Sequence, residues 1–308
     1  MSGTISLITP SYRGDLARSA LLFESVDRHA RAFEKHYVIV HDEDLGLFAP
    51  FNRGRRQVMP VSRFLPGWLH AMPSFIRPRG RLYWWSLKAW PIRGWHTQQI
   101  VKIQAVATLP EERYCLIDSD NCFFRPFDVA ALASPNPVPL YGDPGAVQAD
   151  RPLHAPWLKA AHRLLGLPEP RFPADDHIGQ IIVWDQATIR AMTARIEAVT
   201  GRGWVEALCR EYEFSEYLIY GAFVTNDARR LAATAPTSRS LCRAYWDGET
   251  LDEAGLLALL RGSAPDQVAV CVQSFGATPL AAIRASIRAF EAEAEAAAPA
   301  PPQRNAAR

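Results

Sequence analysis

The sequence lacks the features that mark secreted, zinc-binding and membrane-spanning proteins. Its five cysteines include no Cys-x-x-Cys pair, which argues against a disulfide framework or a zinc knuckle and favours reduced thiols. No uninterrupted apolar run approaches the ~20 residues of a membrane span, and no basic segment leads into an apolar signal core at the N-terminus. We therefore expect a cytoplasmic protein that touches a membrane only at the periphery of its inner surface.

Glycine-rich phosphate-binding motifs are also missing. The chain contains neither Gly-x-Gly-x-x-Gly nor Gly-Lys-Ser/Thr, which argues against the dinucleotide fingerprint and the P-loop. The formal net charge of +2 is nearly neutral, so the overall charge does not favour nucleic acid as a partner. A phosphate ligand would need a different device, and any basic surface must be local.

One long segment has no acidic residue. Between Leu45 and Pro110 there is no Asp or Glu, while arginines and lysines alternate with tryptophans and tyrosines. Such a segment can hold an anionic, partly apolar partner such as a diphosphate, a sugar or a lipid interface. The alternative is a long loop whose tryptophans cover the core and whose arginines are solvated.

Alternating strands and helices at the N-terminus predict an α/β fold. We expect strands over Thr4–Thr9, Lys35–His41 and Gln57–Val61, with a helix from Leu16 to about Phe33. This order predicts a mostly parallel, Rossmann-like sheet flanked by helices, whose ligands bind at the carboxyl ends of the strands. Thr9, Tyr12 and Asp42 fall at such ends.

The chain is expected to form a single domain over residues 1–290, with the aromatic and basic segment as a long insertion. Residues 291–308 are dominated by Ala, Glu and Pro. This composition predicts a fraying helix followed by disorder.

The central candidate site is the stretch from Tyr114 to Phe124, in which an apolar strand ends in Asp118 and Asp120. In an extended segment, residues i and i+2 share a face, so the two carboxylates can converge. Carboxylates that close repel each other unless a cation lies between them, which predicts Mg2+ or Mn2+ completed by phosphate and water. The alternative is a polar turn that merely caps a strand.

A predicted helix over Thr97–Leu109 leads directly into this strand. Gln98 and Lys102 lie one turn apart on it. From this position Lys102 could project over the strand end and meet a phosphate as a point charge. The alternative for a single lysine is a solvated surface side chain.

Two later stretches supply candidate catalytic residues on the acceptor side. Asp176 precedes an expected strand over Ile178–Trp184, which a helix from Asp185 or Gln186 to about Val199 follows. Ser215 can cap a helix that places Glu216 among aromatic residues, where a raised pKa would suit a general base. The alternative for Glu216 is a helix-start carboxylate favoured by the dipole.

The order of these features resembles the GT-A class of nucleotide-sugar glycosyltransferases. More narrowly, Trp95 with Gln98-Gln99 and Lys102, the run from Leu116 to Asp120, and Phe214-Ser215-Glu216-Tyr217 resemble a bacterial family of predicted glycosyltransferases that carries a domain-of-unknown-function label. The resemblance covers roughly Ser6 to Phe275. It implies a metal-dependent enzyme that moves a sugar from a nucleotide diphosphate sugar to a glycan, lipid or other hydroxyl acceptor.

The resemblance also implies roles for individual residues. The metal would lie on Asp118 and Asp120, and Glu216 and Asp176 would be catalytic. The donor nucleotide sugar would be bound by Thr9, Tyr12, Asp42, Gln98, Gln99, Lys102, Asp118 and Ser119. The glycogenin-like branch uses a late histidine as a metal ligand, but this chain has no histidine after His177, so the third ligand stays open.

Two other functions compete with glycosyl transfer. A haloacid-dehalogenase-type phosphatase also ends a strand in Asp-x-Asp, but that family expects Thr or Val four residues after the first Asp, where this chain has Cys122. The other alternative is a non-catalytic module that uses the aromatic and arginine segment to hold a glycan or lipid. The pair of candidate metal carboxylates argues against such a module.

Overall fold

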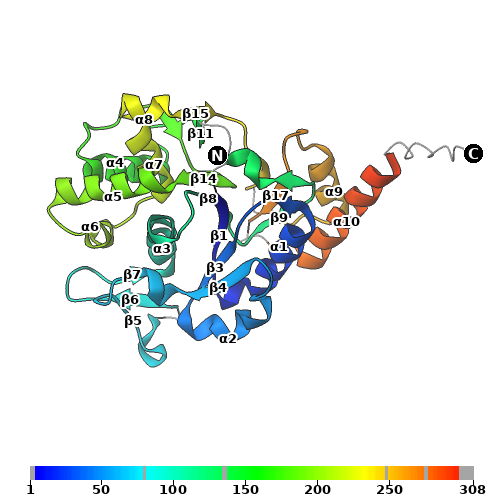
Figure 1. The fold of residues 1–308 in the computed structure, drawn as a ribbon, viewed down its shortest axis with the longest axis horizontal. Helices are drawn as coiled ribbons and strands as arrows, with labels where there is room; N and C mark the ends of the chain where they lie inside the picture. Colours follow the sequence, from blue (N-terminus) through cyan, green and yellow to red (C-terminus); the bar gives the residue numbers. More distant parts are fainter. Residues whose placement is uncertain (1–3, 79–80, 134–136, 247–248, 274–276, 298–308) are drawn as a thin grey trace, which may run out of the picture.

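The computed structural model describes residues 4–78, 81–133, 137–246, 249–273 and 277–297 and shows a mixed α/β fold (Figure 1). A five-stranded sheet has the order β14–β8–β1–β3–β4. Its parallel strands are β1 (Ile5–Ser11), β3 (His36–Val40), β4 (Arg56–Pro60) and β8 (Arg113–Leu116), and the edge strand β14 (Ile182–Asp185) runs antiparallel. The predicted α/β fold with parallel strand pairing is thus confirmed.

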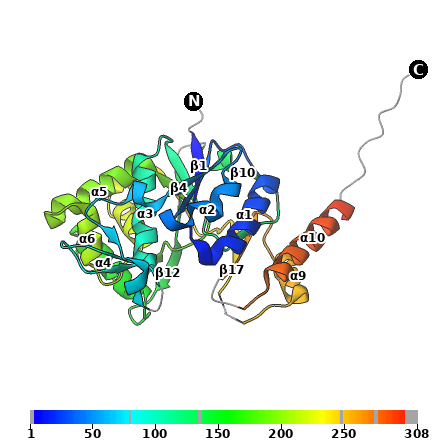
Figure 2. The same cartoon turned by 90° about the horizontal axis from the view of Figure 1, so that it is seen from below.

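Both faces of this sheet are buried, which explains why its strands read as nearly continuous apolar runs. Alternation along the strands places Ile8 and Ile39 in one core and Leu7 and Val38 in the other. The Ile8 core is completed by α3 (Gly94–Thr108), α4 (His154–Leu165), α5 (Gln186–Thr200), α6 (Trp204–Arg210) and α7 (Glu216–Thr225), and the Leu7 core by α1 (Leu16–His29) and α2 (Leu45–Phe48) (Figure 1 and Figure 2).

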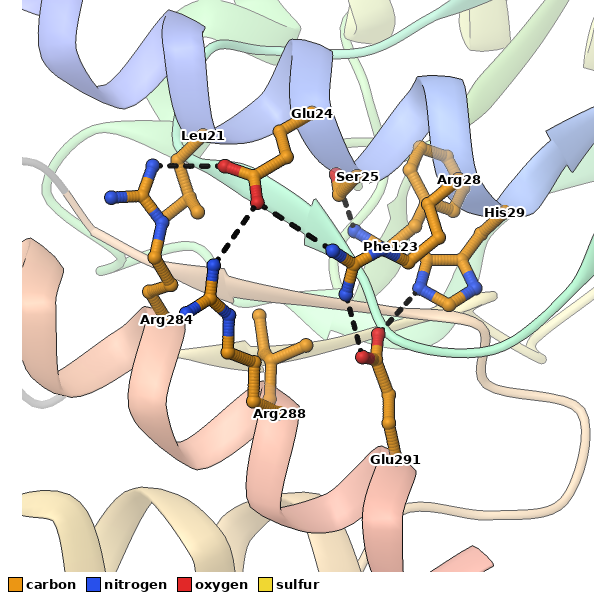
Figure 3. Close-up of a pocket in the computed structure, with 10 residues that line it drawn as sticks. Leu21, Glu24, Ser25, Arg28, His29, Phe123, Arg284, Arg288 and Glu291 are labelled. Atoms are coloured by element: carbon orange, nitrogen blue, oxygen red, sulfur yellow. Dashed lines mark hydrogen bonds and ion pairs between the residues drawn. The ribbon is translucent and has the colours of Figure 1, made fainter. Parts of the chain in front are cut away.

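A second sheet begins directly after Asp120. Strand β9 (Asn121–Phe123) pairs antiparallel with β17 (Ala269–Val272), which pairs in parallel with β16 (Cys242–Tyr245). Helices α9 (Glu253–Arg261) and α10 (Leu280–Ala297) share a small core with these strands. Ion pairs also join α10 to α1, with Glu24 2.9 Å from Arg284 and Arg28 2.7 Å from Glu291 (Figure 3).

The acid-free segment contains a small antiparallel sheet beside α3. It consists of β5 (His70–Ala71), β6 (Tyr83–Trp85) and β7 (Ile92–Arg93) (Figure 1). Trp84 is buried in the main core, whereas Trp90 is exposed. The interpretation that tryptophans of this segment cover the core is therefore confirmed for Trp84, and the expected contact of the segment with an anionic partner stays a prediction.

Short elements complete the described chain. Three two-stranded sheets pair β2 (Ala30–Arg31) with β10 (Phe127–Asp128), β11 (Val138–Tyr141) with β15 (Thr234–Thr237), and β12 (Asp143–Val147) with β13 (Ala174–Asp176). The remaining α-helix is α8 (Ala228–Ala232), and the 3-10 helices are Arg13–Asp15, Asp42–Asp44, Ala49–Phe51, Val61–Phe64, Ser74–Ile76 and Val129–Leu132.

Three predicted boundaries differ from the structure. Helix α1 ends at His29 rather than about Phe33, because the next two residues pair with β10. The strand expected from Ile178 begins at Ile182, since Ile181 has a left-handed φ of 59° that breaks the extended run. The tail expected from residue 291 begins inside α10, and residues 298–308 lie outside the described part of the chain.

Two absences expected from the sequence concern cysteines and membrane spans. All five cysteines are free and buried. Among the described residues, no helix is both long and apolar enough to cross a bilayer.

Candidate functional site

Asp118 and Asp120 lie in a tight turn that joins the two sheets. The parallel pairing of β8 with β1 extends to Ile117, whose N–H donates to the Ile8 carbonyl at 3.0 Å. Asn121 then closes the turn, because both its backbone N–H and its side-chain Nδ2 donate to the Asp118 carbonyl at 3.2 and 3.0 Å. The strand and the polar turn expected from the sequence are thus present, and the assignment of this turn as a site stays a prediction.

Lys102 from α3 reaches this turn and connects it with α7. Its Nζ lies 2.8 Å from Asp118 Oδ1, 3.2 Å from Glu216 Oε1 and 3.1 Å from the Tyr217 hydroxyl. The lysine side chain is only 3% exposed. Burial alone would lower the pKa of Lys102, but the surrounding negative charges, Asp118 first, outweigh burial and hold this pKa well above its ordinary value.

Glu216 lies behind Lys102, at the first position of α7. Ser215 caps this helix as predicted, by accepting from the Leu218 N–H. The backbone N–H of Glu216 donates to Gln99 Oε1 at 2.9 Å, and its side chain is only 5% exposed. Burial raises the pKa of Glu216, and Lys102 opposes this effect. The carboxylate predicted to be a base is thus enclosed in an ion pair.

The aspartate pair offers few ligands for a metal ion. Burial, followed by the charge of Asp118, raises the pKa of Asp120 to about 6. Such a shift is expected where two carboxylates share a partly dry space, and a bound cation would relieve it. Within the described ranges, no group of three or more His, Cys, Asp or Glu side chains is arranged to hold a metal. Two carboxylates do not form a closed protein site, so the expected Mg2+ or Mn2+ would need phosphate and water oxygens as its remaining ligands.

A cleft of about 830 Å³ opens beside this turn, at the carboxyl ends of β1 and β3 and the start of α3. Tyr12 and Gln98, two predicted donor-binding residues, line it. Asp15 connects the cleft with the aspartate turn, because it also lines the cleft and accepts from Ser119 Oγ at 3.1 Å. Asp118, Ser119 and Asp120 do not themselves line the cleft, so this hydrogen bond is what joins the candidate metal carboxylates to it.

Charged side chains in the cleft are mostly paired with one another. Arg13 lies 2.6 Å from Asp44, and Arg77 lies 2.9 Å from Glu43. Arg81 also lines the cleft and has no ion-pair partner among the described residues. Arg81 is therefore the cation in this cleft that is best placed to meet an incoming anion.

One wall of the cleft is aromatic, and the sequence pointed only to its Trp95, which lies in the aromatic and basic segment. The Trp95 and Trp157 rings lie 5.1 Å apart, and Trp157 Nε1 donates to Glu213 Oε2 at 3.3 Å. All three residues line the cleft. Trp157 and Glu213 come from segments far apart in the sequence, so no local pattern could have paired them.

Besides the turn residues, Lys102 and Glu216, four more predicted site residues do not line the cleft. Thr9 is fully buried and its hydroxyl lies 2.9 Å from His36 Nε2. Asp42 accepts from the Ser62 N–H and hydroxyl at 3.1 and 2.5 Å. Gln99 is buried against Glu216.

The fourth of these residues, Asp176, acts on the cleft through its neighbours. Asp176 lies 2.6 Å from His154 Nδ1 and 3.4 Å from Arg151. Burial would raise the pKa of Asp176, but the hydrogen bond from His154 and other donors lower it overall. His154 stacks on Trp157 with ring centres 5.2 Å apart. Asp176 therefore fixes the position of His154, on which Trp157 of the aromatic wall stacks.

The fold and site define a mixed α/β protein with an ion-paired strand end beside a large cleft. The chain belongs to the family of unknown function DUF6492, whose model matches residues 3–295. No curated protein matches the chain.

Proposed function

We propose that the protein is a metal-dependent glycosyltransferase of GT-A type that uses a nucleotide diphosphate sugar. The observation that carries this proposal is the ion-paired cluster of Lys102, Asp118 and Glu216 at a strand end that Asp15 and Ser119 link to the 830 Å³ cleft. Parallel α/β sheets bind nucleotides at this edge. A cleft of this volume lies within the range that small-molecule ligands occupy.

The donor would occupy the cleft with its diphosphate toward the aspartate turn. Tyr12 offers an exposed ring for the base, and Arg81 offers an uncommitted positive charge for the diphosphate. A divalent ion bound by Asp118 and Asp120 would neutralise charge on the departing diphosphate. Lys102 fixes the position of Asp118, so the carboxylate is held in place before the donor arrives.

In the transfer, the bond from the anomeric carbon to the diphosphate oxygen breaks and a bond to the acceptor oxygen forms. The proton of the acceptor hydroxyl must leave in the same process. Glu216 is enclosed with Lys102, whereas Glu213 lines the cleft beside the tryptophan wall. We therefore assign Glu216 to positioning Lys102, and we assign Glu213 to the acceptor hydroxyl as its base or hydrogen-bond partner.

Nucleotide binding tests this proposal directly. A panel of nucleoside diphosphates is screened for thermal stabilisation with and without Mn2+, since a ligand at 100 times its dissociation constant adds about 2.7 kcal/mol. We expect one nucleotide to stabilise the protein in a Mn2+-dependent manner. Asp118→Asn and Asp120→Asn should each remove the Mn2+ dependence, and Asp128→Asn on the distant β10 should not. No stabilisation by any nucleotide, or unchanged Mn2+ dependence in both site variants, would overturn the proposal.

A transfer assay separates the two glutamates once a donor is known. Glu213→Gln should keep donor binding and lose at least about 100-fold in transfer rate if Glu213 is the base. Glu216→Gln should instead change donor affinity or stability, because it disturbs Lys102. A normal transfer rate in Glu213→Gln would remove Glu213 from the chemistry.

A further inference from the structure

Three large side chains are exposed together on the turn between β6 and β7 and on the segment after α6. Leu87 is 99% exposed, Trp90 79% and Tyr212 89%. Trp90 and Tyr212 line the same hollow of about 530 Å³. We call these three residues the Trp90 surface. Exposed apolar side chains gathered in one place, unlike single ones, mark an interaction site.

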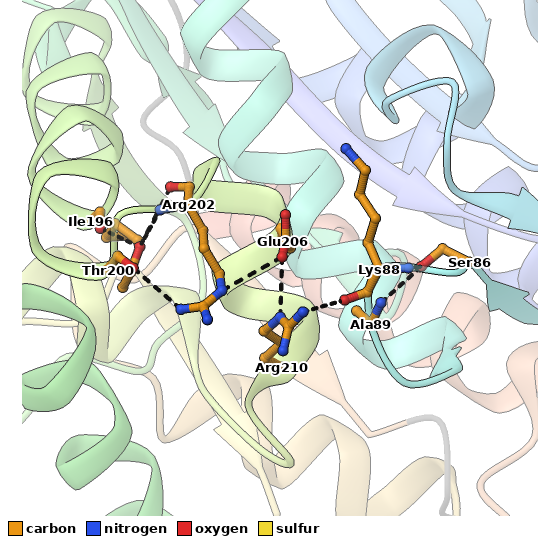
Figure 4. Close-up of polar contacts among 8 residues, drawn as sticks. All are labelled: Ser86, Lys88, Ala89, Ile196, Thr200, Arg202, Glu206 and Arg210. Carbon is orange, nitrogen blue, oxygen red and sulfur yellow. Dashed lines mark hydrogen bonds and ion pairs between the residues drawn. The ribbon is translucent and has the colours of Figure 1, made fainter.

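Hydrogen bonds hold this turn in a fixed shape. Ser86 Oγ accepts from the backbone N–H groups of Lys88 and Ala89 at 3.2 and 3.1 Å (Figure 4). Arg210 donates to the Lys88 carbonyl at 2.7 Å, and Glu206 lies 3.2 Å from Arg210 (Figure 4). The turn and α6 therefore present the apolar side chains as one unit.

The charge around the Trp90 surface is suited to an anionic partner. Lys88 lies over the Trp68 ring at 5.4 Å and has no carboxylate partner within the described ranges. Arg210 and Arg202 share Glu206 as their ion-pair partner, at 3.2 and 3.6 Å, so one positive charge of the two is uncompensated, and their side chains are about half exposed, at 47% and 48%. The segment that forms the turn contains no acid at all between Leu45 and Pro110. Basic residues beside exposed tryptophan and leucine are the combination found at anionic membrane surfaces.

The hollow under Trp90 adds a polar binding site. Its charged lining residues are Arg93, Arg210 and Glu211, which pair with Glu213, Glu206 and Arg163 respectively. His96 also lines it and is only 6% exposed. The Nε2 of His96 donates to the Tyr212 carbonyl at 2.8 Å, so Nδ1 of the neutral ring is an acceptor, and it is buried without a partner in the described structure. Burial lowers the pKa of His96, which keeps the ring neutral. Each arginine uses only part of its guanidinium group for its carboxylate, and the remaining N–H donors together with the Nδ1 acceptor match a phosphate that carries a neighbouring hydroxyl.

We propose that the Trp90 surface docks the protein on an anionic lipid bilayer, with a hydroxyl-bearing phosphate headgroup in the hollow. Tyr83 and Arg93 line both this hollow and the donor cleft, so a headgroup bound here lies next to the reaction site. The docking itself is independent of the reaction. The further statement that the sugar acceptor is presented at a lipid surface rests on the proposed function.

Co-sedimentation of the full chain with vesicles tests the docking without any use of catalysis. We expect binding to phosphatidylglycerol vesicles, weak binding to phosphatidylcholine, and a decrease as salt rises. Leu87→Ser and Trp90→Ser should each weaken binding by about tenfold, since each removes a large apolar group from the bilayer contact. Lys88→Gln should weaken it roughly fivefold. The matched control is Trp246→Ser, which removes a half-exposed tryptophan after β16 and should leave binding unchanged.

The headgroup assignment has its own comparison. Phosphatidylmethanol is anionic but its headgroup has no hydroxyl, so vesicles of this lipid should bind several-fold more weakly than phosphatidylglycerol. Equal binding to both lipids would overturn the assignment of the hollow.

Equal vesicle binding by wild type and Trp90→Ser would overturn the docking surface. If Trp90→Ser instead turns a dimer into a monomer by light scattering, with no vesicle binding in either form, the surface is a contact between copies and the membrane proposal is wrong. Mn2+-dependent nucleotide stabilisation in all these variants keeps the outcome separate from that of the proposed function.

Discussion

Lys102 is a single cation that two carboxylates share in a nearly dry space. Removing one member of such a buried cluster leaves the others without compensation, which costs about 3–5 kcal/mol. We expect Lys102→Met to lower the free energy of unfolding by an amount in this range, because Glu216 then lacks its cation. The double variant Lys102→Met/Glu216→Gln should recover a large part of the loss. Urea denaturation of wild type, both single variants and the double variant measures this coupling.

A lysine in an exposed helical position provides the control for this cycle. Lys159→Met on α4 should change the free energy of unfolding by no more than about 0.5 kcal/mol. If Lys102→Met changes the free energy of unfolding as little as Lys159→Met does, the cluster makes no net contribution to stability. The role of Lys102 would then be in ligand binding rather than in folding.

Arg81 is the cleft residue for which charge and structural role can be separated. We expect Arg81→Ala to weaken binding of a nucleoside diphosphate by about tenfold or more and to leave the corresponding nucleoside nearly unaffected, because only the former offers phosphate charge. Isothermal titration with both ligands measures the difference. Arg239→Ala removes an exposed arginine outside the cleft and should change neither affinity. Equal losses for nucleotide and nucleoside would place the diphosphate elsewhere.

His36 makes stability depend on pH. It is fully enclosed under β1, and burial, helped by Arg56, lowers its pKa to about 3. Between pH 6.5 and 3 the unfolded chain binds a proton that the folded chain refuses, so stability falls as pH decreases through this window, by at most about 4 kcal/mol from this group. Above about pH 7.5 the unfolded chain has also lost this proton, so His36 contributes almost no slope there.

Replacement of His36 isolates this effect from the other titrating groups. His36→Gln lacks the proton equilibrium, so its unfolding free energy should decline less steeply than that of wild type from pH 6.5 downward, whatever its value at pH 7. Urea midpoints at half-unit pH intervals give both slopes. Parallel curves for the two proteins would show that His36 takes up a proton without unfolding.

At the scale of secondary-structure elements, helix α7 packs closely against the His177 ring at Gly221. A Cβ built on Gly221 would lie 2.2 Å from Cγ of the His177 ring, which is far inside contact distance. Since His177 is itself fixed by a hydrogen bond from Nδ1 to the Tyr141 carbonyl at 2.7 Å, the ring has little freedom to move aside. We expect Gly221→Ala to destabilise the protein by about 1–3 kcal/mol through overpacking.

Two variants separate this clash from a general effect of glycine replacement. Gly46→Ala in α2 meets nothing within 4 Å and should be neutral or slightly stabilising. Gly221→Ala/His177→Ala should recover part of the loss, because the obstructing ring is gone. Thermal unfolding of the four proteins checks this, and an undisturbed melting temperature in Gly221→Ala would show that α7 can shift.

Elements with long periodic patterns were predictable from the sequence. Strands β1, β3 and β4 and helices α3 and α5 lie close to their predicted positions, since each has enough residues to show a period and each ends at a turn signal. The sheet β5–β6–β7 was not predicted, because strands of two or three residues show no period and depend on packing against α3.

The candidate site was predictable in its early part and not in its later part. The position of Lys102 on the helix before Asp118 could be inferred because two consecutive elements meet at the strand end. Burial of Glu216 and the position of Glu213 in the cleft lining could not, because the two residues are three positions apart and tertiary packing alone decides which one lines the cleft. Asp42 illustrates the same point, since this strand-end carboxylate is hydrogen-bonded to Ser62 and does not line the cleft.

At the scale of the whole molecule, the C-terminal helix α10 supports the candidate site through a shared core. α10 contributes Ile283 and Ile287 to the small core that it shares with β9, the strand that follows Asp120. We expect a chain ending at residue 279 to lose several kcal/mol of stability and its Mn2+-dependent nucleotide binding, since two buried isoleucines alone contribute about 3–6 kcal/mol. A chain ending at residue 297 keeps α10 and should behave as wild type. Normal nucleotide binding by the shorter chain would show that the site folds without α10.

Because its cysteines are buried, the native chain should react only slowly with thiol reagents. Burial raises the pKa of all five thiols, so neither access nor thiolate is available to an alkylating agent while the fold is intact. A fluorophore or spin label can therefore be attached to one cysteine introduced at position 87 without removal of any natural thiol. The rate at which the natural thiols react then measures how often the core opens.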